Sequence, residues 1–298
     1  MKIKFGQREM DFPGMEMKEL RSSNDILSDF TLLRKRLAED GYLLLRNFIE
    51  ANKVIAARKK TLEFLAQKNV LESAAPVLEG IMPNGAMRVN MEGSKGIVSD
   101  PAILEVLENP RLFTFFSSLF MESSQTYQYK WLRAVGNEGF TGAHYDTVYM
   151  GRGSENLHTA WVPFGEISPE LGSLAICTGS NHLPQFDRLK QTYGKMDVDR
   201  DRVEGWFSKD PMEIVEKFGG QWQTTTYHPG DVIIFGMYTM HASTTNLTNK
   251  YRLSCDIRFQ PQNEEFDDRW AGNNPDGHSG RILKPLTSME EARAKWGI

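Results

Sequence analysis

The feature that most constrains the fold is a series of short strand-like segments in the second half of the chain. Each segment is rich in β-branched and aromatic residues and is bounded by glycine, proline or asparagine. No regular helices alternate with these segments, and this pattern favours a β-sandwich or barrel. The segments span residues 126–136, 156–168, 172–180, 230–246 and 251–260.

The first half of the chain has mainly helical periodicity. Apolar residues recur at close to helical spacing over 24–41, with Asn24 as the expected N-cap and Gly41 after the end. A second helix is expected over 50–70, and two short helices are expected to be split at Pro110. The other expected elements are a buried strand over 41–49, a long loop acting as a lid over 79–100, a helical insertion near 198–218 and a short C-terminal helix with Ser288 or Thr287 as its cap.

Composition excludes several classes of protein. The 298 residues carry a net charge of −4 with acids and bases interspersed, which disfavours a nucleic-acid partner. We also expect no membrane association, because the N-terminus has no signal-like apolar region and no apolar run approaches the ~18 residues of a span. The two cysteines cannot form a disulfide framework, so a reducing, cytoplasmic location is expected. The oligomeric state stays open.

All six histidines lie between His144 and His278, so any imidazole chemistry belongs to the second half. His144 and Asp146 are two residues apart on an expected strand, and would therefore face the same side, with Tyr145 on the other. A third ligand must come from elsewhere, and His241, after the apolar strand that begins at 231, is the best candidate. Two histidines and one carboxylate form a facial set that leaves open positions on Fe(II).

A carboxylate-binding pair is expected beside this set. If Leu247 and Thr248 form a two-residue hairpin turn, Ser243 pairs with Arg252, and His241 pairs with Ser254. Their side chains would then share one face of the sheet. A guanidinium and a hydroxyl near a metal suit a carboxylate ligand, although a register slip of one residue would turn Arg252 to the other face.

These residues together resemble the phytanoyl-CoA dioxygenase family. The resemblance rests on His144-x-Asp146, on His241 with Ser243, and on Arg252, which follows His241 by eleven residues. Further matching segments are the early Gly41-Tyr42 strand, the Trp161-x-Pro163 strand, the ending Gly179-Ser180-Asn181-His182, which carries one inserted residue, and the Gly230-Asp231 turn. The likeness covers roughly residues 25–262.

The resemblance implies a mainly β fold, a double-stranded β-helix (jelly-roll, cupin-like) core buttressed by N-terminal helices. We expect one oxygenase domain over 1–298. Within it, 1–123 would be a mainly helical buttress with the lid loop, 124–262 the jelly-roll core, and 263–298 a C-terminal tail.

The resemblance also implies an enzyme that uses Fe(II), 2-oxoglutarate and O2 to hydroxylate or otherwise oxidise a small metabolite or natural-product intermediate, with release of succinate and CO2. In the family pattern, His144, Asp146 and His241 bind the iron. Arg252 and Ser243 hold the distal carboxylate of 2-oxoglutarate, and Trp161 lines the same pocket. An aspartate at 146 favours hydroxylation over halogenation, because halogenating relatives have a small residue there.

The substrate is expected to be a small molecule, which the sequence does not identify. The candidate substrate residues are Arg88, Arg133, Tyr149, Arg152 and His158, whereas His278 is expected to be exposed. Hydroxylation, desaturation, epoxidation and ring formation all stay open as outcomes. Two alternatives are a cupin-type metal enzyme that does not use 2-oxoglutarate and a non-catalytic jelly-roll binding module.

Overall fold

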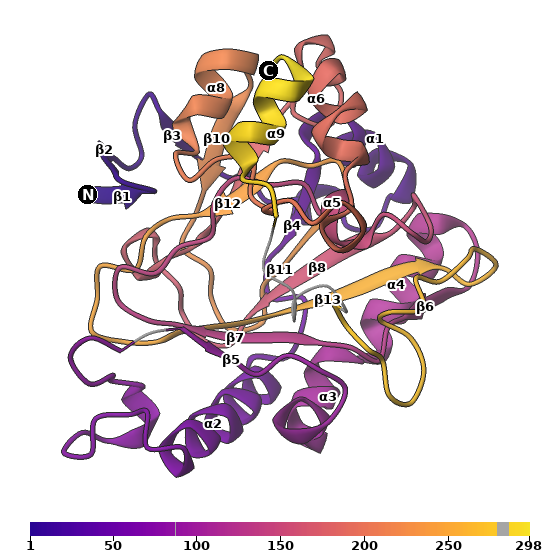
Figure 1. Ribbon diagram of the computed structural model, residues 1–298. Coiled ribbons are helices and arrows are strands. Elements are labelled where there is room, and N and C mark those ends of the chain that lie inside the picture. The colour runs from indigo at the N-terminus through magenta and orange to yellow at the C-terminus, as the bar shows by residue number, and fades with distance from the viewer. Residues whose placement is uncertain (87, 279–285) are drawn as a thin grey trace.

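The computed structural model describes residues 1–86, 88–278 and 286–298, and two β-sheets with flanking helices dominate it (Figure 1). The larger sheet has the strand order β4-β11-β8-β13-β7-β5, with β6 also paired to β13. The smaller sheet has the order β12-β9-β10-β3, and a separate hairpin, β1-β2, lies at the N-terminus. The predicted jelly-roll architecture is confirmed, although neither sheet closes into a barrel.

The strands are short apart from β13. In the larger sheet they are β4 (Tyr42–Leu45), β5 (Val89–Asn90), β6 (Ser124–Thr126), β7 (Trp131–Val135), β8 (His158–Pro163), β11 (Val232–Gly236) and β13 (Arg252–Pro261). In the smaller sheet they are β3 (Met17–Glu19), β9 (Leu174–Thr178), β10 (Gln221–Thr224) and β12 (His241–Ser243), and the separate hairpin is β1 (Lys2–Phe5) with β2 (Arg8–Asp11).

The inner faces of the two sheets pack against each other at one end. Leu44, Trp161 and Phe235 of the larger sheet share a buried cluster with Leu174 and Ile176 of the smaller sheet. Burying these side chains removes apolar surface from water and holds the sheets together at this end. The space between the sheets therefore has a filled apolar end and leaves room for a site beyond it.

Four helices cover the outer face of the larger sheet, and Figure 1 shows α2 and α3 below it. They are α1 (Phe30–Asp40), α2 (Ala51–Gln67), α3 (Pro101–Leu107) and α4 (Pro110–Phe120). Their apolar faces share the largest buried cluster with the outward side chains of β8, β11 and β13. This arrangement is the predicted buttress.

The first helix begins later than predicted. Residues 24–26 form a separate 3₁₀ turn, and α1 starts after Asp29, whose side chain accepts hydrogen bonds from the backbone N–H groups of Thr31 and Leu32. Asp29 is therefore the N-cap in place of Asn24, because it satisfies two of the first unpaired N–H groups of the helix. Gly41 ends the helix in the left-handed conformation, as expected.

Strands from before residue 124 join both sheets. Strand β3 pairs with β10, β4 pairs with β11, and β5 forms an edge of the larger sheet beside β7. The segment 79–100 is thus partly a sheet edge, where a loop was expected. The division of the chain into a buttress, a core and a tail stays a prediction.

The remaining helices lie in connections and at the C-terminus. They are α5 (Thr147–Met150), α6 (Asp187–Gln191), α7 (Val198–Asp201), α8 (Met212–Phe218) and α9 (Met289–Trp296). The expected insertion is thus two short helices with an irregular segment between them. Ser288 caps α9 in a capping box, as predicted. Residues 279–285 of the expected tail lie outside the described residues.

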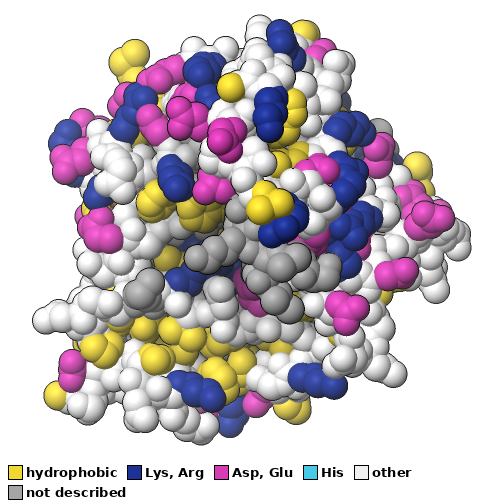
Figure 2. All heavy atoms as spheres, viewed as in Figure 1, with side chains coloured by type: hydrophobic (Ala, Val, Ile, Leu, Met, Phe, Trp, Pro, Cys, Tyr) yellow, Lys and Arg dark blue, Asp and Glu magenta, His cyan; other side chains and the backbone are white. Residues whose placement is uncertain are grey.

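No helix within the described ranges is both long and apolar enough to span a membrane. On the face shown in Figure 2, acidic and basic side chains are interspersed. Both cysteines, Cys177 and Cys255, are buried and unpaired.

Candidate metal and carboxylate site

The site is built around three buried side chains that converge between the sheets. Single ligand atoms of His144, Asp146 and His241 all lie within 4.8 Å of one another, as the ligands of one metal ion do. Asp146 Oδ1 lies 3.9 Å from His144 Nε2 and 3.8 Å from His241 Nε2. Among the described residues, this is the one such group of three or more His, Cys, Asp or Glu side chains.

The backbone brings the two histidines together. The N–H of His144 donates to the carbonyl of His241 at 3.0 Å, and the reverse bond measures 3.1 Å. Each ring is then oriented by its own chain, because Nδ1 lies 2.8 Å from the carbonyl of Gly142 in His144 and 3.0 Å from that of Thr239 in His241. A carbonyl oxygen can accept a hydrogen bond but cannot donate one, so each Nδ1 carries the proton and each Nε2 is free to bind a metal.

Asp146 directs Oδ1 toward the two histidine Nε2 atoms, and its Oδ2 accepts hydrogen bonds from the protein. Oδ2 accepts a 2.6 Å hydrogen bond from Thr159 and a 3.4 Å bond from Arg258. Burial alone would raise the pKa of Asp146, but Arg258 and the two histidines outweigh burial and hold this pKa well below its usual range. Burial and the neighbouring His241 lower the pKa of His144 to about 3. The donor set is thus a carboxylate with neutral imidazole, which suits a divalent metal.

Tyr145 points away from this site. Its hydroxyl donates to the carbonyl of Ser180, and its ring is fully buried in a cluster on the other side of this segment. His144 and Asp146 therefore share a side, as expected, but the expected strand does not form: His144 makes an isolated bridge to His241, and Asp146 has helical dihedral angles directly before α5.

A buried arginine lies in the same cavity. Arg252 is 4% exposed, its Nη1 donates to Ser254, and its Nε has no hydrogen-bond partner. None of the ion pairs among the described residues includes it. Burial, and then the nearby Arg88 and Arg133, lower the pKa of Arg252 to about 9. A guanidinium buried without an acid is costly, and a bound carboxylate would compensate it.

The predicted hairpin between Ser243 and Arg252 is wrong. Strand β12 pairs with β9, so that Ser243 lies opposite Leu174, whereas β13 pairs with β7 and β8 in the other sheet. The chain crosses between the sheets after Ser243. Both side chains nevertheless line one cavity, because the two sheets face each other across it.

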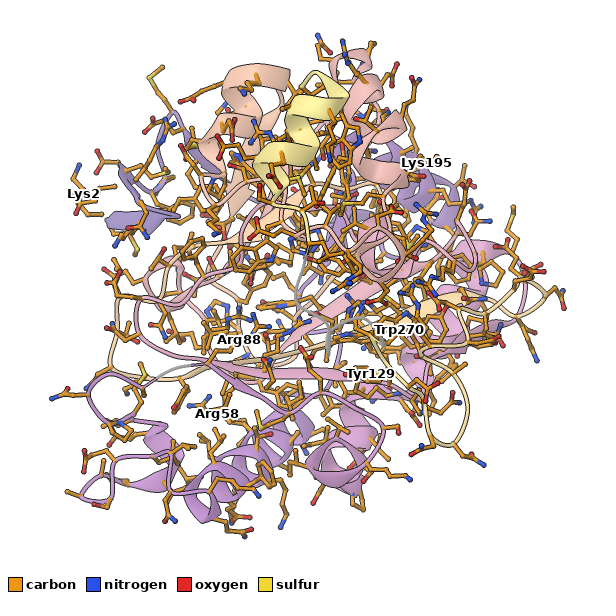
Figure 3. The ribbon with its side chains drawn as sticks, in the orientation of Figure 1. Lys2, Arg58, Arg88, Tyr129, Lys195 and Trp270 are labelled. Atoms are coloured by element: carbon orange, nitrogen blue, oxygen red, sulfur yellow. The ribbon has the colours of Figure 1, made fainter. Side chains whose placement is uncertain are left out.

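Arg88 lies in the same row of the sheet as Arg252. Val89 pairs with Ala134, and continuing this register by one residue places Arg88 opposite Val135, the partner of Arg252. Side chains in one row of a sheet point to the same face. Arg88 also donates to Asn90 and lies 3.9 Å from Glu92, and its position is labelled in Figure 3. Arg88 and Arg252 thus line the cavity together.

The cavity has a volume of about 410 Å³, within the range of small-molecule sites. Tyr149 lies edge-on to the ring of His144. Gly205 makes room for it, since a β-carbon at Gly205 would lie 2.1 Å from the Tyr149 hydroxyl. Aromatic and apolar side chains form much of the remaining wall, and they are Trp131, Met150, Trp161, Leu174, Val198, Val203, Trp206, Phe235 and Trp270, the last labelled in Figure 3.

Three of the five candidate substrate residues line this cavity, namely Arg88, Arg133 and Tyr149. Arg133 is ion-paired with both Glu92 and Asp256, so its charge is already compensated.

The other two candidates do not line the cavity. Arg152 pairs with Asp197 near the surface, and His158 packs against Phe120 in a different pocket. His158 faces away from the cavity because side chains alternate along β8, and Thr159 and Trp161 are the residues that face inward.

Sequence reasoning missed Thr159, Asp256, Arg258 and His278. His278 is buried against Trp270 and paired with Asp199, contrary to the expected exposure. The signal for Asp256 and Arg258 was the period of two that continues inward from Arg252 along β13. His278 carries no such signal, because its position depends on the path of the tail.

Comparisons with known proteins agree with this geometry. The model of the phytanoyl-CoA dioxygenase family matches residues 37–254. The chain is similar to a 1-deoxypentalenic acid 11-beta-hydroxylase of Streptomyces exfoliatus, with 25% identity over 79% of this chain and 83% of the relative.

Solved structures are similar in fold. The epimerase SnoN of nogalamycin biosynthesis, in complex with Fe3+, alpha ketoglutarate and nogalamycin RO, aligns with a TM-score of 0.57 and 17% identity over 87% of this chain and 96% of SnoN. EctD from S. alaskensis aligns with a TM-score of 0.56 and 18% identity over 90% of this chain and 89% of EctD. With the family match covering most of its length, this chain belongs to the phytanoyl-CoA dioxygenase family.

Proposed function

We propose that this protein is an Fe(II)- and 2-oxoglutarate-dependent dioxygenase that oxidises a small organic molecule. The observation that carries the proposal is the content of one cavity, in which three convergent ligands lie beside a buried arginine that has no acid partner among the described residues. The metal ligands alone would also suit a cupin-type enzyme. The arginine favours an enzyme that binds a carboxylate co-substrate.

His144, Asp146 and His241 would hold the iron by Nε2, Oδ1 and Nε2. Thr159 and Arg258 keep the second oxygen of Asp146 occupied, so that this carboxylate presents one oxygen and leaves positions for other ligands. Bound Fe(II) and 2-oxoglutarate together supply the chemistry that activates O2 and yields succinate and CO2. The surrounding aromatic side chains exclude water from the cavity.

Arg252 and Ser243 would bind the distal carboxylate of 2-oxoglutarate, with Trp161 5.9 Å from the guanidinium. Arg88, which the sequence suggested as a substrate residue, is better suited to assist Arg252, because the two share a row across Val135. Two adjacent cations stabilise a carboxylate more than one does.

The substrate would lie against Tyr149 in the remaining part of the cavity. The relative from S. exfoliatus is named as a hydroxylase, and this name favours hydroxylation as the outcome. Arg152 and His158 are not proposed as substrate residues. The two buried, unpaired cysteines agree with a cytoplasmic location, which stays a prediction.

The test is an anaerobic titration of the Fe(II)-loaded protein with 2-oxoglutarate. We expect a weak visible charge-transfer band, which Arg252→Ala loses while it retains iron. Arg88→Met should weaken 2-oxoglutarate binding by a smaller factor, since Arg88 is partly exposed. Arg152→Met is the matched control. The absence of a band in wild-type protein that has bound iron would contradict the proposed function.

A further inference from the structure

A second buried arginine in the cavity has donors that none of the described residues satisfies. Arg258 is 4% exposed and lines the cavity beside Asp146. Its Nε and Nη1 have no hydrogen-bond partner. Buried donors without acceptors are rare in folded proteins and call for an explanation, such as a ligand that supplies the acceptor.

The acids near Arg258 are shared with other cations. Its Nη2 donates to Asp146, whose other oxygen faces the metal site. Its Nη1 lies 3.4 Å from Asp256 without hydrogen-bond geometry, and Asp256 is also paired with Arg133. Trp131 holds the group in place, with the guanidinium carbon 4.1 Å from the ring centroid. Arg258 is therefore fixed in position and incompletely compensated.

The walls next to Arg258 are apolar. Trp131, which lies against the Arg258 guanidinium, shares a buried cluster with Met150 and Tyr149. Trp206 lines the cavity as well and packs on Gly142, where a β-carbon would lie 2.8 Å from the indole. Such walls bind hydrocarbon or ring surface and contribute by its burial. A guanidinium with free donors next to an apolar wall can bind the carboxylate and the hydrocarbon part of one ligand and so fix its orientation.

We propose that Arg258 binds a carboxylate of the substrate, and that the substrates are small organic acids with an apolar body. This inference rests on the proposed function and deepens it. The carboxylate lies beside Asp146, so the carbons near it are the ones presented to the metal. Arg258 thus selects both the class of substrate and the position that is oxidised.

The test compares matched acids and esters. The Fe(II) protein with 2-oxoglutarate is assayed for succinate release with cyclohexylacetic, 1-adamantanecarboxylic and 1-naphthoic acids, each beside its methyl ester and primary amide. We expect the acids to stimulate release and the neutral forms to do so weakly. Arg258→Met should lower kcat/KM for the best acid about 10- to 100-fold and remove the preference for acid over ester. Arg258→Lys should restore part of it, and Arg152→Met should leave it unchanged.

The acid-to-ester ratio within each variant separates recognition from damage to the metal site, which lowers both rates together. If Arg258→Met does not fold, Arg258→Lys and Arg258→Gln carry the comparison. Equal turnover of acids and esters by wild type overturns the proposal, as does an unchanged preference in the variants. So does a fall in 2-oxoglutarate affinity without a change in preference, which would assign Arg258 to the co-substrate. If none of the compounds stimulates succinate release while the charge-transfer band is intact, organic acids are refuted as the substrate class. If the band is missing, the proposed function itself is refuted.

Discussion

The two faces of strand β13 are equally buried but chemically opposite. Every residue from Arg252 to Pro261 is buried. The outward side chains Leu253, Cys255, Ile257 and Phe259 join the apolar cluster under the N-terminal helices. The inward side chains Arg252, Ser254, Asp256 and Arg258 line or border the cavity with hydroxyls and charges.

This contrast shows that burial does not by itself reveal what a side chain does. On the outer face, Phe259 stacks on Phe116 at 4.3 Å between ring centroids, and burial stabilises the fold. On the inner face, burial of Arg252 and Arg258 costs free energy that the contacts with their few partners do not fully compensate. The outer face serves stability, and the inner face serves ligands. Four changes test this division.

The largest effect is expected on the outer face. Phe259→Ala removes a fully buried ring and leaves a cavity, and we expect a loss of about 3–5 kcal/mol in the free energy of unfolding. Urea unfolding followed by circular dichroism measures this loss. The metal affinity of the folded fraction should stay unchanged. A change in metal affinity at a temperature where the variant is fully folded would show that the two faces are coupled.

Asp146→Ala tests the inner face. Removal of one of the three ligands should weaken Fe(II) or Co(II) binding by more than the roughly 10- to 100-fold cost of losing a supporting partner. Stability of the metal-free protein should change much less than in Phe259→Ala. Anaerobic metal titration gives the affinity, and metal binding at wild-type strength would rule out Asp146 as a ligand.

Acidification should destabilise the metal-free protein through His144. Its pKa is lowered by burial to about 3, whereas the unfolded chain binds a proton near pH 6.5. As the pH falls below about 6.5, His144 becomes protonated in the unfolded state but stays neutral in the folded state. The free energy of unfolding therefore declines by up to about 1.4 kcal/mol per pH unit. His144→Gln should show a shallower decline between pH 7 and 5. An identical pH dependence in wild type and variant would contradict this assignment.

The smallest effect is expected for Thr159→Val, which preserves shape and removes the 2.6 Å hydrogen bond to Asp146. Losing one such bond costs roughly 1 kcal/mol, or about fivefold in metal affinity. Thr61→Val, which removes a buried 2.9 Å hydrogen bond to the carbonyl of Ala57 within α2, is the control. Metal binding that is as weak as in Asp146→Ala would mean that Thr159 determines the position of Asp146 almost alone.

Local sequence patterns were sufficient to predict the direction of a side chain where that direction depends only on its spacing from neighbouring residues. The spacing of two between His144 and Asp146 placed both on one side, with Tyr145 buried opposite. Alternation along β13 also defines which of its residues face inward, although only Arg252 was recognised as a site residue. These features depend on backbone geometry, which is a property of neighbouring residues.

Strand partners and the paths of connections could not be predicted in this way. The pairing of Ser243 with Arg252 was wrong because β12 belongs to the other sheet. Arg152 and His158 were assigned to the wrong side of their segments. His278 enters the cavity wall because the tail crosses back to Asp199. Apart from that for His158, which the alternation along β8 turns outward, each of these errors concerns a contact between residues that are distant in sequence.

The sequence by itself determined the residue types of the site, the period of the strands and the resemblance to a family with known chemistry. Only the tertiary structure decided that Arg252 faces Ser243 across two sheets, that Arg88 shares its row, and that Arg258 has unsatisfied donors beside Asp146. The physical reason is that alternation and spacing act within a few residues. Burial, charge compensation and strand pairing are set by packing between segments that meet only in the folded chain.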